Sequence, residues 1–546
     1  MISRRCSSLW EELIEGERSI LHACKGGSLR AAVLFPSQYQ VAMANLGFQV
    51  VYRILSGHPA WLVDRFFLPP PGIRLGPKEE VPSFEGHLPL SEFHLVAASI
   101  SFENDLLNLV RLLEQGGIPA RREERDSSHP FVLLGGIVPS ANPEPFAPFA
   151  DAILVGEAEE SLFTFLSILE EGWDDEPRRL LERLSQVPGL YLPGLYRSLY
   201  DAFGRYVGIE PLGDFVMPIP RVTWNTFSKE GTRSCVTSSS SHFSGMDLVE
   251  VSRGCPNLCN FCMAAHLNRP VRFVERDVLF AHLQDCGDRV GLVGTSIWPP
   301  GYVVEVVEQA LALGKNVSFS SLRVDAPLAL FEAMRRGGVL SATLGVEAAS
   351  EDRRERAGKA FSNQFLEERV LELARMGFEN IKLYFMLGLP PLNLQEEVDE
   401  MVVLVKRLAH LLRSNRLGTR LSVSVASFVP KPHTPFQREP MAEREALNRA
   451  MRRAERALKS ERSIAFTCEL PKWSIVQGLV SRGDRLVGEV LYRVAMGESL
   501  RRALAASNCN LNYYLHRRRG PQEPLPWEIV EVDSSTGRVT STGKVR

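Results

Sequence analysis

The chain has 546 residues, of which 45% are hydrophobic and 23% are charged, and its formal net charge is −2. This length and composition are enough for about two to four domains with hydrophobic cores. The near-neutral charge excludes a global attraction to nucleic acid or anionic lipid. Nothing in the sequence resembles a signal peptide or an apolar run long enough to span a membrane, so we expect a cytoplasmic protein.

The first 190 residues are predicted to form a lead-in helix, over residues 1–27, and then an α/β domain over residues 28–190. In the domain, short apolar runs alternate with segments of helical spacing. This alternation is typical of a parallel, doubly wound, Rossmann-like sheet. The predicted strands are 30–35, 65–68, 94–101, 130–134 and 152–155, and the predicted helices are 40–55 and 105–115.

The loops that follow these strands are predicted to bind a ligand, because ligands of doubly wound sheets lie beyond the carboxyl ends of the strands. Glycine in such a loop lets a bulky ligand approach the backbone closely, although for any one glycine pair an ordinary turn explains the residue equally well. The candidate binding residues are Ser99, Ser101, Gly135, Gly136, Gly156 and Glu157.

Residues 191–245 are predicted to connect this domain to a second α/β unit. They contain a predicted β-hairpin around residues 201–204 and a serine run at 238–241 that indicates a flexible linker. Residues 246–440 then alternate again between strand and helix patterns. The predicted strands of this second unit are 247–252, 290–295, 317–321, 342–347, 380–386 and 421–428.

Three cysteines follow the first of these strands. Cys255, Cys259 and Cys262 have the spacing C-x₃-C-x₂-C, and no fourth cysteine lies nearby. Three thiolates this close can hold one face of a cubane iron–sulfur cluster, which takes four when fully ligated, so one iron would stay open to another molecule. The alternative is a zinc site, for which His266 is the only other nearby candidate ligand. The remaining six cysteines are isolated, which favours reduced thiols over a disulfide framework.

The cysteine loop resembles that of the radical SAM superfamily. The resemblance implies that Cys255, Cys259 and Cys262 bind a [4Fe-4S] cluster whose open iron binds S-adenosylmethionine (SAM). An electron from a donor such as flavodoxin or ferredoxin then cleaves SAM to a 5′-deoxyadenosyl radical. It also implies that residues 246–440 form a partial (β/α)6 TIM-type barrel. The implied SAM-binding residues are Phe261 and Met386 near adenine, and Gly294, Thr295, Ser320, Arg323 and Glu347 near the polar groups. For Arg323 and Glu347, a salt bridge with each other or at the surface is the structural alternative.

The first domain resembles the cobalamin-binding domain that often precedes a radical SAM core. The resemblance rests on the segments 133–136 and 152–159, and on motifs elsewhere at 35–37, 99–103, 142–145, 320–323 and 481–484. Many such domains carry a histidine after the first strand that ligates cobalt, whereas residues 37–45 here contain none. Either cobalamin binds without a protein nitrogen ligand, or the domain is a relic of the fold; both interpretations stay open.

Residues 441–546 are predicted to be a mainly helical region whose tail, from residue 521, forms a packed strap and a disordered end. Tyr384, on the fifth strand of the second unit, and His433, in a proline-rich loop, are weak candidates for catalysis. A histidine in such a loop more often bonds to backbone. Tyr513 and Tyr514 beside the arginines 517–519 could contact RNA, although a solvated helix end is the more common explanation.

These observations favour a radical SAM enzyme that transfers a methyl group from cobalamin to an unactivated carbon. The alternatives are a cobalamin-independent radical SAM enzyme that modifies RNA or protein, and a non-catalytic iron–sulfur scaffold that binds RNA. The sequence does not indicate the substrate.

Overall fold

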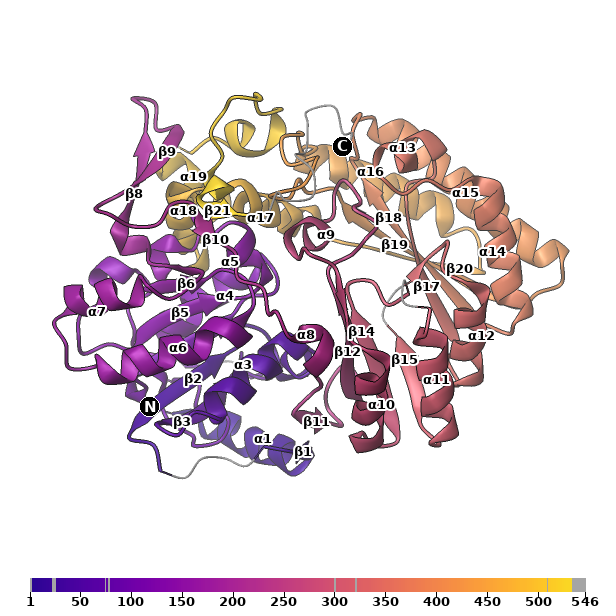
Figure 1. The fold of residues 1–546 in the computed structure, drawn as a ribbon. Coiled ribbons are helices and arrows are strands. Elements are labelled where there is room, and N and C mark those ends of the chain that lie inside the picture. The colour runs from indigo at the N-terminus through magenta and orange to yellow at the C-terminus, as the bar shows by residue number, and fades with distance from the viewer. Residues whose placement is uncertain are drawn as a thin grey trace.

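The structure is a computed structural model that describes residues 2–21, 26–73, 75–76, 79–298, 301–319, 322–507 and 509–532. Figure 1 shows two α/β units side by side, with the C-terminal helices packed against the N-terminal unit. None of the described helices is long and apolar enough to cross a membrane.

The N-terminal unit is the predicted doubly wound sheet. Its strands have the order β3-β2-β4-β5-β6-β7, and all pair in parallel except β7, which is antiparallel to β6. The chain order therefore reverses at β2, which makes the carboxyl ends of β2 and β4 the switch point of the sheet. The strands are β2 (Leu29–Leu34), β3 (Trp61–Phe66), β4 (Leu95–Ser99), β5 (Phe131–Gly135), β6 (Ala152–Leu154) and β7 (Leu190–Tyr191).

Helices cover both faces of this sheet because its strands are apolar on both sides. All five residues of β4 are buried, for example, and such strands need a covering layer on each face. The helices are α2 (Tyr39–Ala42), α3 (Leu46–Ser56), α4 (Asp105–Gln115), α5 (Ile137–Ala141), α6 (Ala158–Glu171) and α7 (Pro177–Leu184). Within the range of the predicted lead-in helix, residues 1–27, the structure has a shorter helix, α1 (Arg4–Glu15), followed by a strand, β1 (Glu17–Ser19).

The connecting region forms the predicted hairpin but not the predicted linker. Strands β8 (Tyr196–Tyr200) and β9 (Tyr206–Pro211) are antiparallel. The prediction of a flexible linker at 238–241 is wrong for Ser238. This residue ends β11 (Val236–Ser238), is buried and pairs with Glu17 of β1. This pairing joins distant parts of the chain, so no local pattern indicates it. The remaining elements are β10 (Ile219–Pro220) and α8 (Phe227–Glu230).

The second unit contains all six predicted strands. They belong to two sheets of order β13-β12-β14-β15 and β16-β17-β18-β19-β20, parallel except for β13. Over the residues that the structure describes, these sheets do not form a closed barrel. The strands are β12 (Asp247–Arg253), β13 (Arg272–Phe273), β14 (Arg289–Gly294), β15 (Asn316–Phe319), β16 (Leu322–Arg323), β17 (Ser341–Glu347), β18 (Asn380–Leu387), β19 (Arg420–Ser427) and β20 (Ile464–Cys468).

Strand β20 is an addition to the predicted set, since residues from 441 onwards were expected to be helical. Only Ile464 of its five residues is buried, so the strand lacks the apolar pattern that identifies a buried strand. Most helices of this unit lie on the side of the strands away from the N-terminal unit (Figure 1). They include α10 (Arg276–Asp285), α11 (Val303–Ala312), α12 (Leu328–Arg336), α13 (Glu351–Arg356), α14 (Asn363–Arg375), α15 (Leu394–Ser414) and α16 (Arg444–Leu458).

The C-terminal region is helical, as predicted, and joins the two units. Asn142 of the first unit donates hydrogen bonds from Nδ2 to the carbonyl oxygens of Val480, Ser481 and Gly483. Lys431 of the second unit forms an ion pair with Glu103 of the first. The motifs at 99–103, 142–145 and 481–484 thus meet at one junction. The elements are α17 (Pro471–Arg482), α18 (Arg485–Ala495), α19 (Leu500–Ala506) and β21 (Val530–Glu531), which pairs with β10.

Candidate functional site

The three cysteines lie on a loop between β12 and the short helix α9 (Met263–Leu267). Gly254, the first residue after β12, has φ +79°, and a Cβ atom there would overlap the carbonyl oxygen of Asn268. Glycine is therefore required for the chain to turn into the loop. Cys255 and Cys259 are buried and Cys262 is half-buried, although among the described residues no three His, Cys, Asp or Glu side chains are gathered closely enough to hold a metal ion.

Contacts from the rest of the second unit hold this loop in place. The backbone N–H of Asn260 donates to the carbonyl oxygen of Ala357 at 2.9 Å, and its side chain donates to that of Arg356 at 2.7 Å. The Nε2 atom of His266 lies 3.1 Å from the carbonyl oxygen of Cys259. His266 thus serves the backbone of the loop, whereas the zinc alternative would require it to join the thiols.

The surroundings of the sulfur atoms fit a cluster of net negative charge. Arg323 Nη1 lies 3.6 Å from Cys259 Sγ, and Asn257 Nδ2 lies 3.4 Å from Cys255 Sγ. Burial raises the pKa of the Cys259 thiol, while the nearby charges of Lys359 and Arg323 act in the opposite direction. Hydrogen bonds and positive charge at the sulfur atoms are what stabilise a thiolate-bound cluster.

The two residues expected near adenine lie together beside the cysteine loop. Phe261 and Met386 pack against a small apolar cluster of Ala348, Leu389 and Phe428. Four chain segments far apart in sequence contribute to it, namely the cysteine loop and the ends of β17, β18 and β19. The arrangement provides an apolar surface of the kind that a nucleobase stacks on.

The residues expected near the polar groups of SAM are only partly gathered. Arg323 pairs with Asp325 at 2.8 Å, and Glu347 pairs with Lys359 at 2.7 Å, so the suggested Arg323–Glu347 salt bridge does not form. Glu347 has φ +67°, an uncommon conformation for a glutamate that often occurs at binding sites. Gly294 packs against Ser252, where a Cβ atom would overlap the serine hydroxyl. Ser320 lies outside the described residues.

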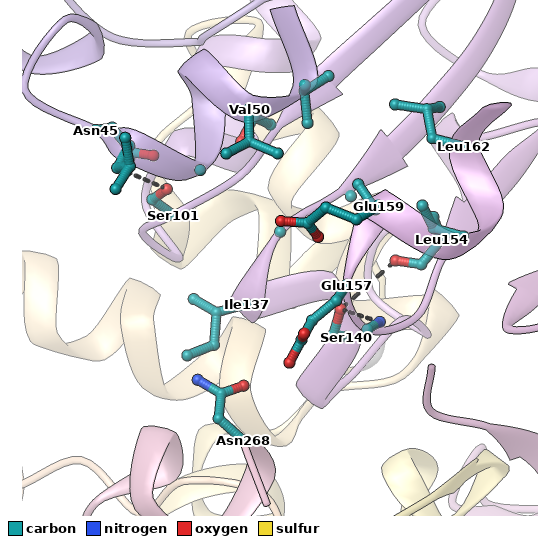
Figure 2. Close-up of a pocket in the computed structure, with 18 of the residues that line it drawn as sticks. Asn45, Val50, Ser101, Ile137, Ser140, Leu154, Glu157, Glu159, Leu162 and Asn268 are labelled. Atoms are coloured by element: carbon teal, nitrogen blue, oxygen red, sulfur yellow. Dashed lines mark hydrogen bonds between the residues drawn. The ribbon is translucent and has the colours of Figure 1, made fainter. Parts of the chain in front are cut away.

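A cavity of about 300 Å³ lies at the carboxyl ends of β4, β5 and β6. Residues of helices α3 and α6 line its sides. Figure 2 shows the side chains of Asn45, Val50, Glu157 and Leu162, which lie around the cavity. Residues of the second unit, including Thr295 and Asn268, close the other side. All six ligand-binding candidates of the first domain line this cavity: Ser99, Ser101, Gly135, Gly136, Gly156 and Glu157.

The glycines of the cavity differ in what they accommodate. Gly136 has φ +106° and Gly156 has φ +114°, and a Cβ atom at either position would overlap backbone atoms of Ile100 or Val222. Glycine is therefore needed at these two positions because another backbone segment of the protein packs closely against them, and not because a ligand does. At Gly135 the nearest atom to an added Cβ is 4.0 Å away, so this glycine leaves space for close approach of a ligand.

Glu157 is the centre of a buried network of charges between the two units. Its carboxylate accepts hydrogen bonds from Arg221 at 3.2 Å, Arg253 at 3.0 Å and Arg272 at 2.5 Å. Burial alone would raise the pKa of Glu157, but the hydrogen bond from Arg272 and the charges of Arg253 and Arg272 lower it to about 2. The carboxylate is therefore charged at neutral pH and fixed by its partners.

Sequence reasoning missed the arginines of this network and the other carboxylates beside it. Arg253 also pairs with Glu159 at 2.7 Å and with Glu250 at 2.9 Å. The wall of the cavity thus carries three carboxylates and two arginines, Arg221 and Arg253, while Arg272 binds Glu157 without lining the cavity. The sequence signal that could have indicated a role for Arg253 at the site is its position, two residues before the first cysteine of the motif.

The two weak catalytic candidates differ in their surroundings. Tyr384 is half-buried on β18, whereas His433 forms a hydrogen bond with the backbone of the first unit. The Nε2–H group of His433 donates to the carbonyl oxygen of Ala141 at 2.9 Å, across the boundary between the units. Burial lowers the pKa of His433 to about 4. The ring is then neutral at physiological pH, and its proton is engaged by a backbone carbonyl.

We expect His433→Asn to destabilise the protein by about 1 kcal/mol at pH 7.5, the usual contribution of one hydrogen bond. Asparagine tolerates the φ of +58° at this position but does not reach Ala141 as the imidazole does. A histidine whose pKa is lowered on folding stabilises the fold above its ordinary pKa of about 6.5, and this stabilisation is lost as the pH falls towards about 4. Because asparagine does not titrate, the variant should lose less stability than the wild type on acidification. Urea unfolding at pH 7.5 and pH 5 measures both effects; an equal acid dependence in variant and wild type would contradict the assignment.

The aromatic and basic residues near the C-terminus are largely used inside the protein. Tyr514 is buried and donates from its hydroxyl to Asp484 at 3.0 Å, and Arg519 is buried and donates to the carbonyl oxygen of Arg482. Arg517 is paired with Glu523. Tyr514 and Arg519 therefore cannot contact RNA directly, and the RNA prediction is left without these two residues.

Comparison with known proteins identifies the families that both units resemble. The family described as radical SAM proteins, N-terminal, matches residues 47–193, and the radical SAM superfamily matches residues 249–405. Together the two models cover more than half of the chain. The uncharacterized protein MJ0966 of Methanocaldococcus jannaschii is 25% identical over 466 residues, which cover 84% of this chain and 90% of that protein.

Two solved structures are similar at low sequence identity. The radical SAM methyltransferase TsrM from Kitasatospora setae, with cobalamin and a [4Fe-4S] cluster bound, has a TM-score of 0.49 and 12% identity, covering 88% of this chain and 100% of that one. The cobalamin-dependent SAM radical enzyme OxsB has a TM-score of 0.45 and 14% identity, covering 78% of this chain. This chain spans only 62% of the length of OxsB.

Proposed function

Because the chain belongs to the radical SAM superfamily and is an enzyme of that kind, we propose that it transfers a methyl group from cobalamin to an unactivated carbon. When bound, the cluster supplies the electron that cleaves SAM to methionine and a 5′-deoxyadenosyl radical, and cobalamin supplies the methyl group. Cys255, Cys259 and Cys262 hold the cluster. Phe261 and Met386 provide the surface for adenine.

The observation that carries the methyl-transfer proposal is the cavity between the two units. It lies at the ligand-binding edge of a doubly wound sheet, and residues that follow the cysteine loop and β14 form one of its walls. A ligand in the cavity therefore lies next to the elements that carry the cluster. A volume of about 300 Å³ suits the nucleotide part of cobalamin, so the larger corrin ring has to lie at the mouth.

The charge of the cavity supports the same ligand. Its wall has no excess of positive charge, because it combines three carboxylates with two arginines, and Arg253 pairs with Glu157, Glu159 and Glu250. The corrin ring carries neutral amide side chains, which donate to carboxylates and accept from guanidinium groups. A dinucleotide with two phosphates would instead favour an excess of positive charge.

The described residues of the cavity wall include no histidine, cysteine, methionine or lysine. We therefore expect cobalamin to bind without a nitrogen or sulfur ligand from this wall. EPR of ¹⁵N-labelled protein loaded with unlabelled cob(II)alamin measures this, because a protein ¹⁵N on cobalt splits each line into two, whereas the benzimidazole ¹⁴N of cobalamin itself splits it into three. A two-line splitting would contradict this expectation, even if the enzyme is active.

Filling the cavity should block cobalamin binding. Val51, a half-buried residue of α3, lines it, and we expect Val51→Trp to weaken cobalamin binding by at least about tenfold, which corresponds to about 1.4 kcal/mol. The matched control is Val403→Trp, which adds the same bulk on the exposed side of α15. Equilibrium titration followed by absorbance measures both. Unchanged binding in Val51→Trp would place cobalamin elsewhere.

The test of the whole proposal is anaerobic reconstitution with iron, sulfide and cobalamin, then reduction in the presence of SAM. Formation of 5′-deoxyadenosine together with bound corrinoid supports it. Formation of 5′-deoxyadenosine without any corrinoid binding would remove the methyl transfer and leave the second candidate, a cobalamin-independent radical SAM enzyme. The absence of a histidine from residues 37–45 is the observation that favours that second candidate. An electron donor such as flavodoxin or ferredoxin is part of either proposal.

A further inference from the structure

Strand β18 has one apolar face and one polar face, and the polar face is directed away from the helices. Ile381, Leu383 and Phe385 are buried in the core, whereas Lys382 and Tyr384 alternate with them and are half-buried. Helices α14 and α15 contact β18 and lie on the outer side of the sheet (Figure 1). Lys382 and Tyr384 therefore lie on the inner face, on the same side as Met386.

Hydroxyl groups flank Lys382 and Tyr384 on the neighbouring strands. In the register of the sheet, Lys382 lies between Thr343 of β17 and Ser422 of β19, and Tyr384 lies beside Ser424 of β19. Side chains of paired residues point to the same face of a sheet. The inner face around Lys382 thus carries an ammonium group and several hydroxyl groups, all of which can donate hydrogen bonds.

Lys382 has no counter-ion among the described residues. Its Nζ atom lies 4.8 Å from the centroid of the Tyr384 ring, and no carboxylate within the described part of the chain forms a salt bridge with it. Strands β18, β19 and β20 contain no acidic residue. The one acidic residue of β17, Glu347, is already paired with Lys359 at 2.7 Å. A half-buried ammonium group in this setting favours an anionic partner from outside the chain.

The position of Lys382 along the strand relates this site to the proposed SAM site. Met386, four residues further along β18, packs with Phe261 in the apolar cluster assigned to adenine. Four residues of extended strand span about 13 Å. A molecule that binds Lys382 at one end can therefore reach towards the adenosyl group at its other end, with Tyr384 beside its middle.

We propose that the substrate is a small molecule with an oxyanion, a carboxylate or a phosphate, which Lys382 and the flanking hydroxyl groups bind on the inner face of β17, β18 and β19. The inference rests on the proposed function, because it takes the inner face to be where the radical meets its substrate. The spacing of about 13 Å between the backbone positions of Lys382 and Met386 sets the scale of the separation between the oxyanion and the carbon that reacts. An uncharged substrate would leave the ammonium group of Lys382 with the Tyr384 ring but with no anionic partner among the described residues.

The test uses inorganic phosphate and acetate as probes of the reconstituted full-length protein. Each is titrated at constant ionic strength, with chloride as the balancing anion, and the shift of the thermal unfolding midpoint gives the apparent Kd. We expect saturable stabilisation by one of the probes, and Lys382→Met to weaken that binding by about tenfold or more. Stabilisation by phosphate alone or by acetate alone distinguishes a phosphate-bearing from a carboxylate-bearing substrate.

Two further variants make the result specific. Lys382→Arg keeps the positive charge and should retain most of the binding. Lys472→Met is the matched control, because the ammonium group of Lys472 also lies 4.8 Å from an aromatic ring, that of Trp473, but on α17. Unchanged binding in Lys382→Met, equal loss in Lys472→Met, or no saturable stabilisation of the wild type would overturn the proposal.

Formation of 5′-deoxyadenosine by the wild type is measured in the same preparations. If it forms but neither anion binds at Lys382, the oxyanion site is wrong and the radical chemistry stands. If anions bind through Lys382 but no 5′-deoxyadenosine forms, the site stands as an anion site and the proposed function is wrong.

Discussion

Replacing Cys259 by alanine is expected to abolish both the iron–sulfur cluster and the cleavage of SAM. A cluster held by three thiolates has no spare protein ligand, so the loss of one leaves two irons without protein ligands. Cys259 is also the thiolate that Arg323 approaches at 3.6 Å. We expect formation of 5′-deoxyadenosine to fall by at least about a thousandfold, since the uncatalysed cleavage is negligible.

The measurements are iron and sulfide content, EPR of the reduced protein and 5′-deoxyadenosine formed from SAM. The matched control is Cys468→Ala, which removes an exposed thiol at the end of β20 and should leave all three unchanged. A Cys259→Ala protein that keeps a normal cluster signal and cleaves SAM would disprove the assigned cluster site. Loss of iron in both variants would show only that the protein is fragile.

The second large effect is expected for Glu157→Gln, which removes the charge at the centre of the network between the units. Breaking a buried ion pair from one side costs about 3–5 kcal/mol, because the partner charges stay buried. The pKa of Glu157, about 2, indicates a similar value of about 3 kcal/mol relative to an ordinary glutamate. We therefore expect a loss of about 3 kcal/mol in the free energy of unfolding at pH 7.

The dependence on pH provides an independent check. A carboxylate whose pKa is lowered on folding stabilises the fold above its ordinary pKa, and this stabilisation disappears as the pH falls towards the folded value. For Glu157 the window runs from about pH 5 down to about pH 2. Urea unfolding of wild type and Glu157→Gln across this range should converge at its acid end.

The matched control is Glu160→Gln. Glu160 lies three residues further on, is exposed and forms no salt bridge within the described residues. Its replacement should change stability by less than about 0.5 kcal/mol. Equal losses for Glu157→Gln and Glu160→Gln would show that the arginine network does not stabilise the contact between the units.

Much of the fold was predictable because it follows from local patterns. The five parallel strands of the first unit and the six strands of the second are apolar runs that alternate with helices, and both features can be counted along the sequence. Strand β20 was missed because four of its five residues are not buried. Strand β1 was missed because β11, the strand it pairs with, lies more than 200 residues away.

The candidate site was predictable to a similar extent. The pairing of Phe261 with Met386 in one apolar cluster agrees with the roles that the family resemblance implied. The partners of Arg323, Glu347 and His433 could not be predicted, because each is decided by which side chains the folded chain brings within about 3 Å. The same holds for Gly136 and Gly156, whose neighbours are backbone segments from other parts of the chain.

The sequence by itself determined the spacing of the three cysteines and the alternation of strands and helices, because covalent spacing and the period of apolar residues are properties of the chain alone. Only the tertiary structure decided which charges are paired and which are not. Glu157 meets its arginines, and Lys382 meets no carboxylate in the part of the chain that the structure describes, because packing of distant segments selects their neighbours. That selection is what distinguishes a charge that stabilises the fold from one left available to a ligand.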